Sequence, residues 1–430
     1  MNDNGEFAAH EALRILRAPA TIRGRCAAIA AAVTDGDSPH FAIDRSCLGD
    51  VARRVARLTR QRFPDLKIPY HSRWRHFEAG GVDRKAELDA KLAGRSTTAL
   101  ARAHIDLTVV SVLLDAGAGP QWGYREQASG ASFSRSEGLA VASFRAFMAG
   151  RFSSDAGDPC RADAAGLLRL DAAALSDIFQ VTAGNPLVGL EGRAALMRRL
   201  GEALRAQPEM FTSAGQPGHL FDALTHHPHA PRMRHHRLGP SAPQQVHVSA
   251  ARILGALLDA FSGIWPNGQA LPPGVPLGDV WRHPQAGGSG LSAGWVPFHK
   301  LSQWLTYSLL EPFEWAGVEV AGLADLTALP EYRNGGLLLD AGVIVPRDRE
   351  ALQDRRTPGD PWVVEWRALT VALIDELAPL IRTELGAAAD TLPLACLLEG
   401  GTWAAGRQIA AERRDSGAPP VQIDSDGTVF

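Results

Sequence analysis

Cysteine is scarce in this chain, and the few cysteines present lie far apart. The 430 residues include four cysteines, none of them in a C-x-x-C pair: Cys26, Cys47, Cys160 and Cys396. Zinc knots need close cysteine pairs, and small secreted domains use cysteine much more densely. The scarcity excludes a disulfide scaffold and a cysteine-based zinc site, and it predicts reduced thiols in a cytoplasmic protein.

Long apolar runs and an excess of one charge are missing as well. The net charge is −3 with 21% charged residues, so no strong field draws the chain to nucleic acid or to a membrane surface. The segment ILGALLDAFSGIW contains Asp259 and is shorter than the roughly 20 residues of a membrane span. The first residues, MNDNGEFAAHEALRILRAPA, lack the apolar core of a signal peptide. We therefore expect no nucleic-acid partner, no membrane span and no targeting segment.

Apolar residues recur at three- and four-residue spacing along most of the chain, as in amphipathic helices. Alanine, leucine, arginine and glutamate, all strong helix formers, fill these segments. Strand-like alternation is rare, although VAGLADLT and GVIVP suggest a short strand each. The sequence predicts a mainly α protein. Its expected helices lie in residues 10–18, 48–63, 97–117, 136–152, 190–207, 248–265, 297–317 and 361–385.

One continuous helical domain over residues 1–430 is the interpretation that we favour, because neither half has an obviously capped end. Two segments interrupt the helical pattern, a polar loop at about 225–247 and a loosely packed tail at 413–430. The loop is rich in histidine, a residue that can bind metals in such tracts. Proline and arginine interrupt the tract, so we interpret it as a flexible loop without a metal. Its histidines are His226, His227, His229, His235 and His236.

The segment LTALPEYRNGGLLLD, residues 326–340, places opposite charges side by side in apolar surroundings. Pro330 disfavours helix before it and suits the first helical position, with Glu331 in the first turn. A solvated helix start with Glu331 and Arg333 in water is one interpretation. Asn334 and the two glycines after it favour another, since glycine lets a ligand approach the backbone.

The segment WVVEWRALTVALIDEL is apolar nearly all round, which predicts a buried helix. Glu365 and Arg367 lie within it, about 200° apart at the helical period, so they do not pair with each other. An unpaired buried charge costs several kcal/mol, so each needs a partner from elsewhere. Such groups are site candidates, with a structural ion pair to another helix as the alternative.

The segment VPFHKLSQWLTYSLLEPFEW brings Lys300, Gln303 and Tyr307 to one helix face, at three- and four-residue spacing. A cation, an amide and a phenol on one face suit a phosphate and sugar hydroxyls. The alternative is an amphipathic helix with this side in water. Neither a phosphate-binding loop nor G-x-S-x-G nor a dinucleotide fingerprint occurs in the chain.

Several segments together resemble the uracil-catabolism family of the URC pathway of fungi and bacteria. They are LTALPEYRNGGLLLDAGVI, GHLFDAL, LGDVWRHP, VPFHKLSQWLTYSLLEPFEWAG and LLEGGTWAAGRQIA. The resemblance covers nearly the whole chain. In that pathway uracil is ribosylated and its ring is opened, with ribosylurea as an intermediate. It implies a role in uracil breakdown, with the ring-opening enzyme as a possible partner, but it does not supply the reaction.

A more remote likeness to another family does suggest a reaction. The segments LDAAALSDIFQ, NPLVGLEGRAALMRRLGEAL, PFHKLSQWLTYSLL, LTALPEYR and VEWRALTVALIDEL are similar to queuosine 5′-phosphate N-glycohydrolases. Those proteins are helical and related to helix-hairpin-helix DNA glycosylases, which implies a glycosylase-like fold. They carry Asp-Tyr-Arg where this chain has Glu331, Tyr332 and Arg333, so the acid here is one methylene longer.

The likeness predicts a metal-independent hydrolase of the N-glycosidase type, without cofactor, that releases urea from ribosylurea or its 5′-phosphate. Cleaving a ribosyl C–N bond passes through an oxocarbenium-like state that a carboxylate stabilises. We expect Glu331 at the anomeric carbon, with Arg333 and Glu365 orienting it or the leaving group. The expected substrate-binding residues are Lys300 and Arg367 at the phosphate, Gln303, Tyr307 and Tyr332 at the sugar, and Asp222 in GHLFDAL.

Two other functions fit the sequence. One is an amidohydrolase that releases ammonia from the ring-opened intermediate, usually at a metal centre of histidines and aspartates. The other is a non-catalytic scaffold that receives the intermediate from the ring-opening enzyme.

Overall fold

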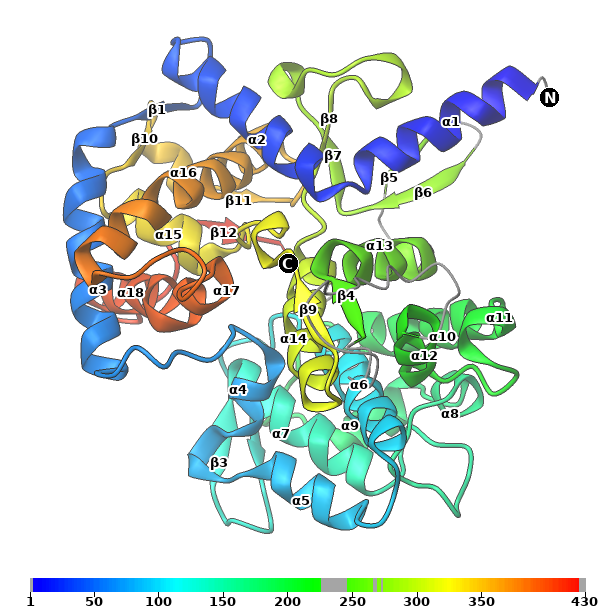
Figure 1. Cartoon of the computed structure of the whole chain (residues 1–430). Helices are drawn as coiled ribbons and strands as arrows, with labels where there is room; N and C mark the ends of the chain where they lie inside the picture. Colours follow the sequence, from blue (N-terminus) through cyan, green and yellow to red (C-terminus); the bar gives the residue numbers. More distant parts are fainter. Residues whose placement is uncertain (1–2, 226–245, 266–268, 272–273, 425–430) are drawn as a thin grey trace, which may run out of the picture. The chain divides into compact units, whose positions relative to one another are not determined.

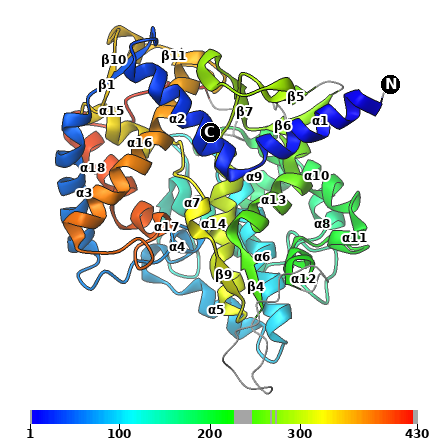
Figure 2. The same ribbon diagram turned by 45° about the horizontal axis from the view of Figure 1, so that its top comes forward.

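The computed structural model describes residues 3–225, 246–265, 269–271 and 274–424, and it is mainly helical, as predicted (Figures 1 and 2). Contacts between Cα atoms divide the chain into two compact units. Unit 1 comprises residues 1–71, 267–303 and 323–424, and unit 2 comprises residues 72–266, 304–322 and 425–430. The single domain and the glycosylase-like fold stay predictions.

Helix α16 (Pro361–Leu385) is the central helix of unit 1. It packs against α2 (Pro19–Thr34), α3 (Leu48–Arg62) and α15 (Tyr332–Asp340), and α15 in turn packs against α18 (Trp403–Arg413). Figures 1 and 2 both place α16 between α2 and α15. The other helices of the unit are α1 (Asp3–Leu16) and α17 (Leu394–Leu397), and a π-helical turn (Leu398–Thr402) joins α17 to α18.

The ends of α16 follow from its sequence. Asp360 precedes the helix and accepts a hydrogen bond from the backbone N–H of Trp362 at 2.9 Å, and Pro361 occupies the first helical position. Gly386 ends the helix with a φ of 69°, a conformation that glycine adopts without a steric penalty. Every residue from Trp362 to Ile374 is buried, as its all-round apolar sequence predicts.

Short strand pairs connect the helices of unit 1. β1 (Phe41–Ile43) pairs antiparallel with β10 (Ile344–Pro346), which is the strand suggested by GVIVP. The other pairs are β5 (Gln269–Leu271) with β6 (Val275–Gly278), β7 (Val280–Arg282) with β8 (Trp295–Pro297), and β11 (Arg355–Arg356) with β12 (Gln422–Ile423), the last pair parallel. The described part of the tail thus includes β12, and Val421 before it is buried.

Unit 2 is built around α6 (Thr97–Leu113), whose residues from Ala103 to Leu113 are all buried. It packs against α7 (Arg135–Met148), α10 (Leu190–Arg205) and α12 (Leu220–Thr225), and α10 packs against α8 (Ala164–Leu168), α9 (Ala172–Ile178) and α13 (Ala250–Phe261). The remaining helices described wholly within unit 2 are α4 (Arg73–Phe77), α5 (Arg84–Lys91) and α11 (Pro208–Phe211). Its strand pairs are β2 (Gly123–Arg125) with β3 (Ser132–Ser134) and β4 (His247–Ser249) with β9 (Glu319–Ala321).

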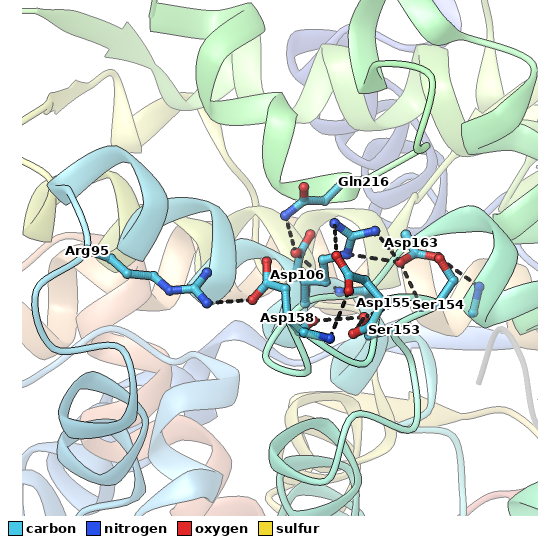
Figure 3. A network of polar contacts seen from close by, with 12 residues as sticks. Arg95, Asp106, Ser153, Ser154, Asp155, Asp158, Asp163 and Gln216 are labelled. Atoms are coloured by element: carbon cyan, nitrogen blue, oxygen red, sulfur yellow. Dashed lines mark hydrogen bonds and ion pairs between the residues drawn. The ribbon is translucent and has the colours of Figure 1, made fainter.

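A polar network in unit 2 ties residues 153–163 and Gln216 to α6 (Figure 3). Asp106 of α6 is fully buried, and it accepts hydrogen bonds from the Gln216 amide at 2.7 Å and from the backbone N–H groups of Ala162 and Gly218. Asp163 caps α8 through the N–H of Gly166 and pairs with Arg161 at 2.9 Å. Burial raises the pKa of Asp106 to about 8, although these hydrogen bonds partly offset the effect.

Each of the eight segments with helical periodicity contains a helix, with boundaries shifted by up to about one turn at most ends. The largest shift is at the first, where α1 begins at Asp3. Helix α14 (Lys300–Trp315) starts in unit 1, and from Trp304 on its residues belong to unit 2. The predicted polar loop and its five histidines fall within residues 226–245, outside the described residues.

Candidate functional site

Glu331 is the N-cap residue of α15. Its backbone is extended, and its two carboxylate oxygens accept hydrogen bonds from the backbone N–H groups of Arg333 and Asn334, both at 2.6 Å. The helix therefore begins at Tyr332, two residues after the predicted first helical position at Pro330, because Glu331 caps the helix from outside it. The solvated helix start is wrong, since only 8% of Glu331 and 6% of Arg333 are exposed.

Opposing effects act on the pKa of the Glu331 carboxyl. Burial raises the pKa of its carboxyl above the usual value, because the charged form loses hydration. The two backbone hydrogen bonds and the charges of Lys300 and His71 act in the other direction. The helix start also favours a negative charge at this position. A buried carboxylate whose pKa is shifted by burial and by specific neighbouring groups is a candidate for a functional site.

Arg367 forms a buried ion pair with Asp279. Its two terminal nitrogens lie 2.8 and 2.7 Å from the two carboxylate oxygens, and its guanidinium stacks on the Phe298 ring at 4.2 Å. Burial alone would raise the pKa of Asp279, but Arg367 and neighbouring donors lower it to about 2. The expected partner from elsewhere is thus confirmed. The predicted role of Arg367 at a phosphate stays a prediction, and here both terminal nitrogens are used by Asp279.

Asp279 also fixes the start of α14. Its side chain accepts the backbone N–H of Lys300 at 3.0 Å, and its carbonyl accepts those of Phe298 and His299. His299 has a φ of 46°, an unusual conformation for a residue with a side chain. The Arg367 Nε lies 3.4 Å from the carbonyl of Pro330, next to Glu331. The ion pair therefore connects the start of α14 to the start of α15.

Gln303 fastens the chain before Glu331 to α14. Its amide oxygen accepts the backbone N–H of Thr327 at 2.9 Å, and its amide nitrogen donates to the Thr327 hydroxyl and to the carbonyl of Phe298. Both Gln303 and Tyr307 are fully buried, so the interpretation of this helix face as a wet surface is wrong. The structure thus brings four predicted site residues together in unit 1, namely Glu331, Lys300, Gln303 and Arg367. We call these four residues the Glu331 cluster.

Glu365 belongs to a separate buried group. Its carboxylate accepts a hydrogen bond from the Ser38 hydroxyl, and it lies 3.3 Å from Nε2 of His283. The other ring nitrogen of His283 accepts the backbone N–H of Gln285 at 3.3 Å, so Nε2 is the nitrogen that carries the proton and faces Glu365. Glu365 therefore has local partners of its own, and its role in orienting Glu331 stays a prediction.

The remaining predicted residues lie in two other places. Arg333 stacks on Tyr332, with 5.2 Å between its guanidinium carbon and the ring centre, and it donates to the carbonyl of Gly417 at 3.2 Å. Tyr307 and Asp222 belong to unit 2. Asp222 forms a two-pronged ion pair with Arg102 at 2.7 and 2.6 Å, and its pKa is lowered because hydrogen bonds from His219 and Arg102 outweigh burial.

Three residues near Glu331 were missed by the sequence reasoning. Asp279 lies in LGDVWRHP and Glu399 in LLEGGTWAAGRQIA, two segments that carried the family resemblance without any residue being singled out. His71 follows Tyr70 in a segment without helical periodicity. Its Nδ1 lies 2.9 Å from the Glu399 carboxylate. A search for polar residues within the resembling segments would have found the two acids.

The chain matches the model of a family described as protein of unknown function, DUF1688, over residues 15–430. It is 38% identical over 423 residues to uracil catabolism protein 4 of Lachancea kluyveri, covering 92% of this chain and 93% of the relative. The chain belongs to this family. A second member, protein urg3 of Schizosaccharomyces pombe, is 38% identical over 397 residues, with 91% and 92% of the two chains covered.

The match to uracil catabolism protein 4 confirms the predicted resemblance to uracil-catabolism proteins, and the likeness to queuosine glycohydrolases stays a prediction. Among the described residues, no three histidine, cysteine, aspartate or glutamate side chains lie together as a metal site would require. Within the same residues, every helix is too short or too polar to cross a membrane.

Proposed function

We propose that the protein acts in uracil catabolism as an N-ribosylhydrolase that releases urea from ribosylurea or from its 5′-phosphate. The names of its relatives support the pathway. The observation that supports the reaction is the buried Glu331 carboxylate, held by two backbone N–H groups at 2.6 Å beside Lys300. Its negative charge is suited to the cation that develops on the ribosyl ring as the C–N bond breaks.

The members of the Glu331 cluster have different roles in this proposal. Glu331 activates a water molecule or stabilises the ribosyl cation. Lys300 binds the 5′-phosphate as a point charge. Gln303 and Arg367 use their polar groups within the protein, so we assign them to positioning, Gln303 for the chain that leads to Glu331 and Arg367 for the start of α14.

Urea release by the purified full-length protein tests the function. We expect urea from ribosylurea or its 5′-phosphate, and at least about a 100-fold loss in Glu331→Gln, because the loss of the charge removes electrostatic stabilisation of the transition state. The matched control is Asp360→Asn, which neutralises another N-cap acid of unit 1. It should lose helix stability of about 0.5–2 kcal/mol at most and keep its activity.

Other outcomes would overturn the proposal. The proposal would be wrong if the folded wild-type protein released no more urea than Glu331→Gln from either form of the substrate. Ammonia in place of urea would favour the amidohydrolase. Binding of the ring-opening enzyme without turnover would favour the scaffold.

A second experiment tests the phosphate. For the phosphorylated substrate, Lys300→Met should raise KM by about 10- to 100-fold, the value of one lost charge-assisted hydrogen bond. For the unphosphorylated substrate KM should change much less. Equal changes for both forms would show that Lys300 does not bind the phosphate.

A further inference from the structure

His71 is buried, and a chain of polar contacts holds it through one ring nitrogen and its backbone. Its Nδ1 lies 2.9 Å from Oε2 of Glu399, and the other oxygen of Glu399 accepts a hydrogen bond from Arg62 at 3.0 Å. The backbone N–H of His71 donates to the carbonyl of Ala395. Burial would raise the pKa of Glu399, but the contacts with His71 and Arg62 lower it below its usual value. Glu399 is therefore ionised, so Nδ1 carries a proton and Nε2 is directed away from Glu399.

Helix packing places this pair beside the first turn of α15. A Cβ atom added to Gly406 of α18 would lie 2.2 Å from the carbonyl oxygen of Arg333, so the two helix backbones touch two residues after Glu331. Trp403 lies one turn before Gly406 on the same side of α18. The ring of His71 packs on Trp403 with 6.1 Å between ring centres. The electrostatic effect of His71 on Glu331 agrees with this position.

We propose that His71 is the general acid of the reaction, that its Nε2–H protonates the departing nitrogen of urea, and that Glu399 and Arg62 hold the ring for this task. This proposal rests on the N-ribosylhydrolase function. Urea leaves poorly as an anion, so a positioned acid should contribute about 10²- to 10⁴-fold to the rate.

The step balances in atoms and electrons. The step starts from the imidazolium form of His71, which carries a proton on each ring nitrogen. The C1′–N bond breaks, its electron pair stays on the urea nitrogen, and the Nε2 proton moves to that nitrogen, which leaves neutral His71 with its proton on Nδ1. The oxygen of water bonds to C1′ and loses its proton to the Glu331 carboxylate. Ribose and urea result, and the proton on Glu331 returns to His71 through solvent.

Substrates with different leaving groups test the proposal. Ribosylurea needs protonation of its leaving group, whereas 4-nitrophenyl ribofuranoside does not, because nitrophenolate is stable as an anion. His71→Gln should lose about 100-fold or more in kcat/KM on ribosylurea and less than about 10-fold on the nitrophenyl substrate. Glu331→Gln should lose activity on both. Glu399→Gln keeps a hydrogen-bond partner for His71 without the charge, and it should show a smaller loss confined to ribosylurea.

The matched control is His104→Gln in unit 2, which also replaces a buried histidine paired with a carboxylate, Asp89 at 2.7 Å. It should leave both activities within about threefold of the wild type. Equal losses on both substrates in His71→Gln, or no loss, would overturn the assignment of the acid while the proposed function stands. Wild-type protein that hydrolyses neither the nitrophenyl substrate nor ribosylurea, with or without its 5′-phosphate, would overturn the function itself.

If the wild type hydrolyses ribosylurea but not the nitrophenyl substrate, kcat and KM on ribosylurea are measured separately for wild type and His71→Gln. Loss of the acid should then lower kcat with KM nearly unchanged. A change confined to KM would show that His71 binds substrate and does not protonate it.

Discussion

Two buried charges in unit 1, Glu331 and Arg367, are stabilised in different ways. Glu331 relies on backbone N–H groups, which keep their positions as long as α15 is folded. Arg367 relies on one carboxylate, Asp279, and both side chains are nearly inaccessible to water. Removing one member of such a pair leaves the other as an isolated buried charge.

Arg367→Met should therefore destabilise the protein by about 3–5 kcal/mol. In the double variant with Asp279→Asn much of this loss should be recovered, because no unpaired charge remains. Urea denaturation of four proteins, the wild type, the two single variants and the double variant, measures the coupling. If the double variant were as unstable as the sum of the single variants, the pair would not be acting as a unit.

Asp106 should make stability fall as pH rises. Its folded-state pKa of about 8 lies above the usual value of 3.8, so between these values the folded protein binds a proton that the unfolded chain has lost. Stability then decreases with pH by up to about 1.4 kcal/mol per unit from this group. In denaturation of wild type and Asp106→Asn from pH 5 to 8, the free energy of unfolding of the wild type should fall relative to that of the variant as pH rises.

Asp163 is the matched control in the same network (Figure 3). Hydrogen bonds from Ser154, Gly166 and Arg161 outweigh burial, and its pKa is lowered. The stability that ionised Asp163 contributes is fully present above the usual pKa of an aspartate, and it is lost only as pH falls below that value. Asp163→Asn should therefore give a constant difference from pH 5 to 8, and a parallel slope in both variants would contradict the assignment to Asp106.

At the scale of elements, the contact between α15 and α18 depends on a missing side chain. Gly406→Ala should destabilise the protein by roughly 1–3 kcal/mol, because a Cβ atom would lie 2.2 Å from a backbone oxygen that cannot move aside alone. Gly24→Ala in α2 is the control, since nothing lies within 4 Å of its added Cβ. It should stabilise the protein by about 0.5–1 kcal/mol. Thermal unfolding measures both, and similar shifts in the two variants would contradict the close packing.

Periodicity predicted the long helices because each buries one stripe or its whole surface. It did not single out α2, whose alanine-rich sequence has only a weak apolar stripe, or α18, whose contact with α15 is made by a glycine. The short strands escaped prediction because a pair such as β1 and β10 is held by partners about 300 residues apart in the sequence. Such pairs depend on tertiary contacts more than on local preference.

Within the candidate site, the sequence predicted the residues whose surroundings are unusual locally. Glu331 follows a proline beside glycines, and Glu365 and Arg367 interrupt an apolar helix. Periodicity did not predict their partners. Ser38 lies in a distant segment without a local signal, and Asp279 lies in LGDVWRHP, which carried the family resemblance but has no helical pattern. The separation of Glu365 from Arg367 did follow from helix geometry, and the structure confirms it.

At the scale of the whole molecule, unit 1 is assembled from three separate stretches of chain. Its first stretch, residues 1–71, contains α2 and α3, and both pack against α16 from the last stretch. A fragment of residues 1–71 should therefore be largely unfolded, because the apolar faces of its helices have no partner. Far-UV circular dichroism measures this, and a cooperative melting transition of the fragment would contradict it.

The cap on α15 has a consequence for substrate binding. Because both oxygens of Glu331 are tied to N–H groups of its own helix, the side chain has already given up its rotational freedom before any ligand arrives. An unrestrained glutamate would lose about 1.5–2 kcal/mol of conformational entropy on being ordered. A sugar that binds at Glu331 does not have to order this side chain. More of its binding free energy is therefore available for distorting the ring toward the transition state.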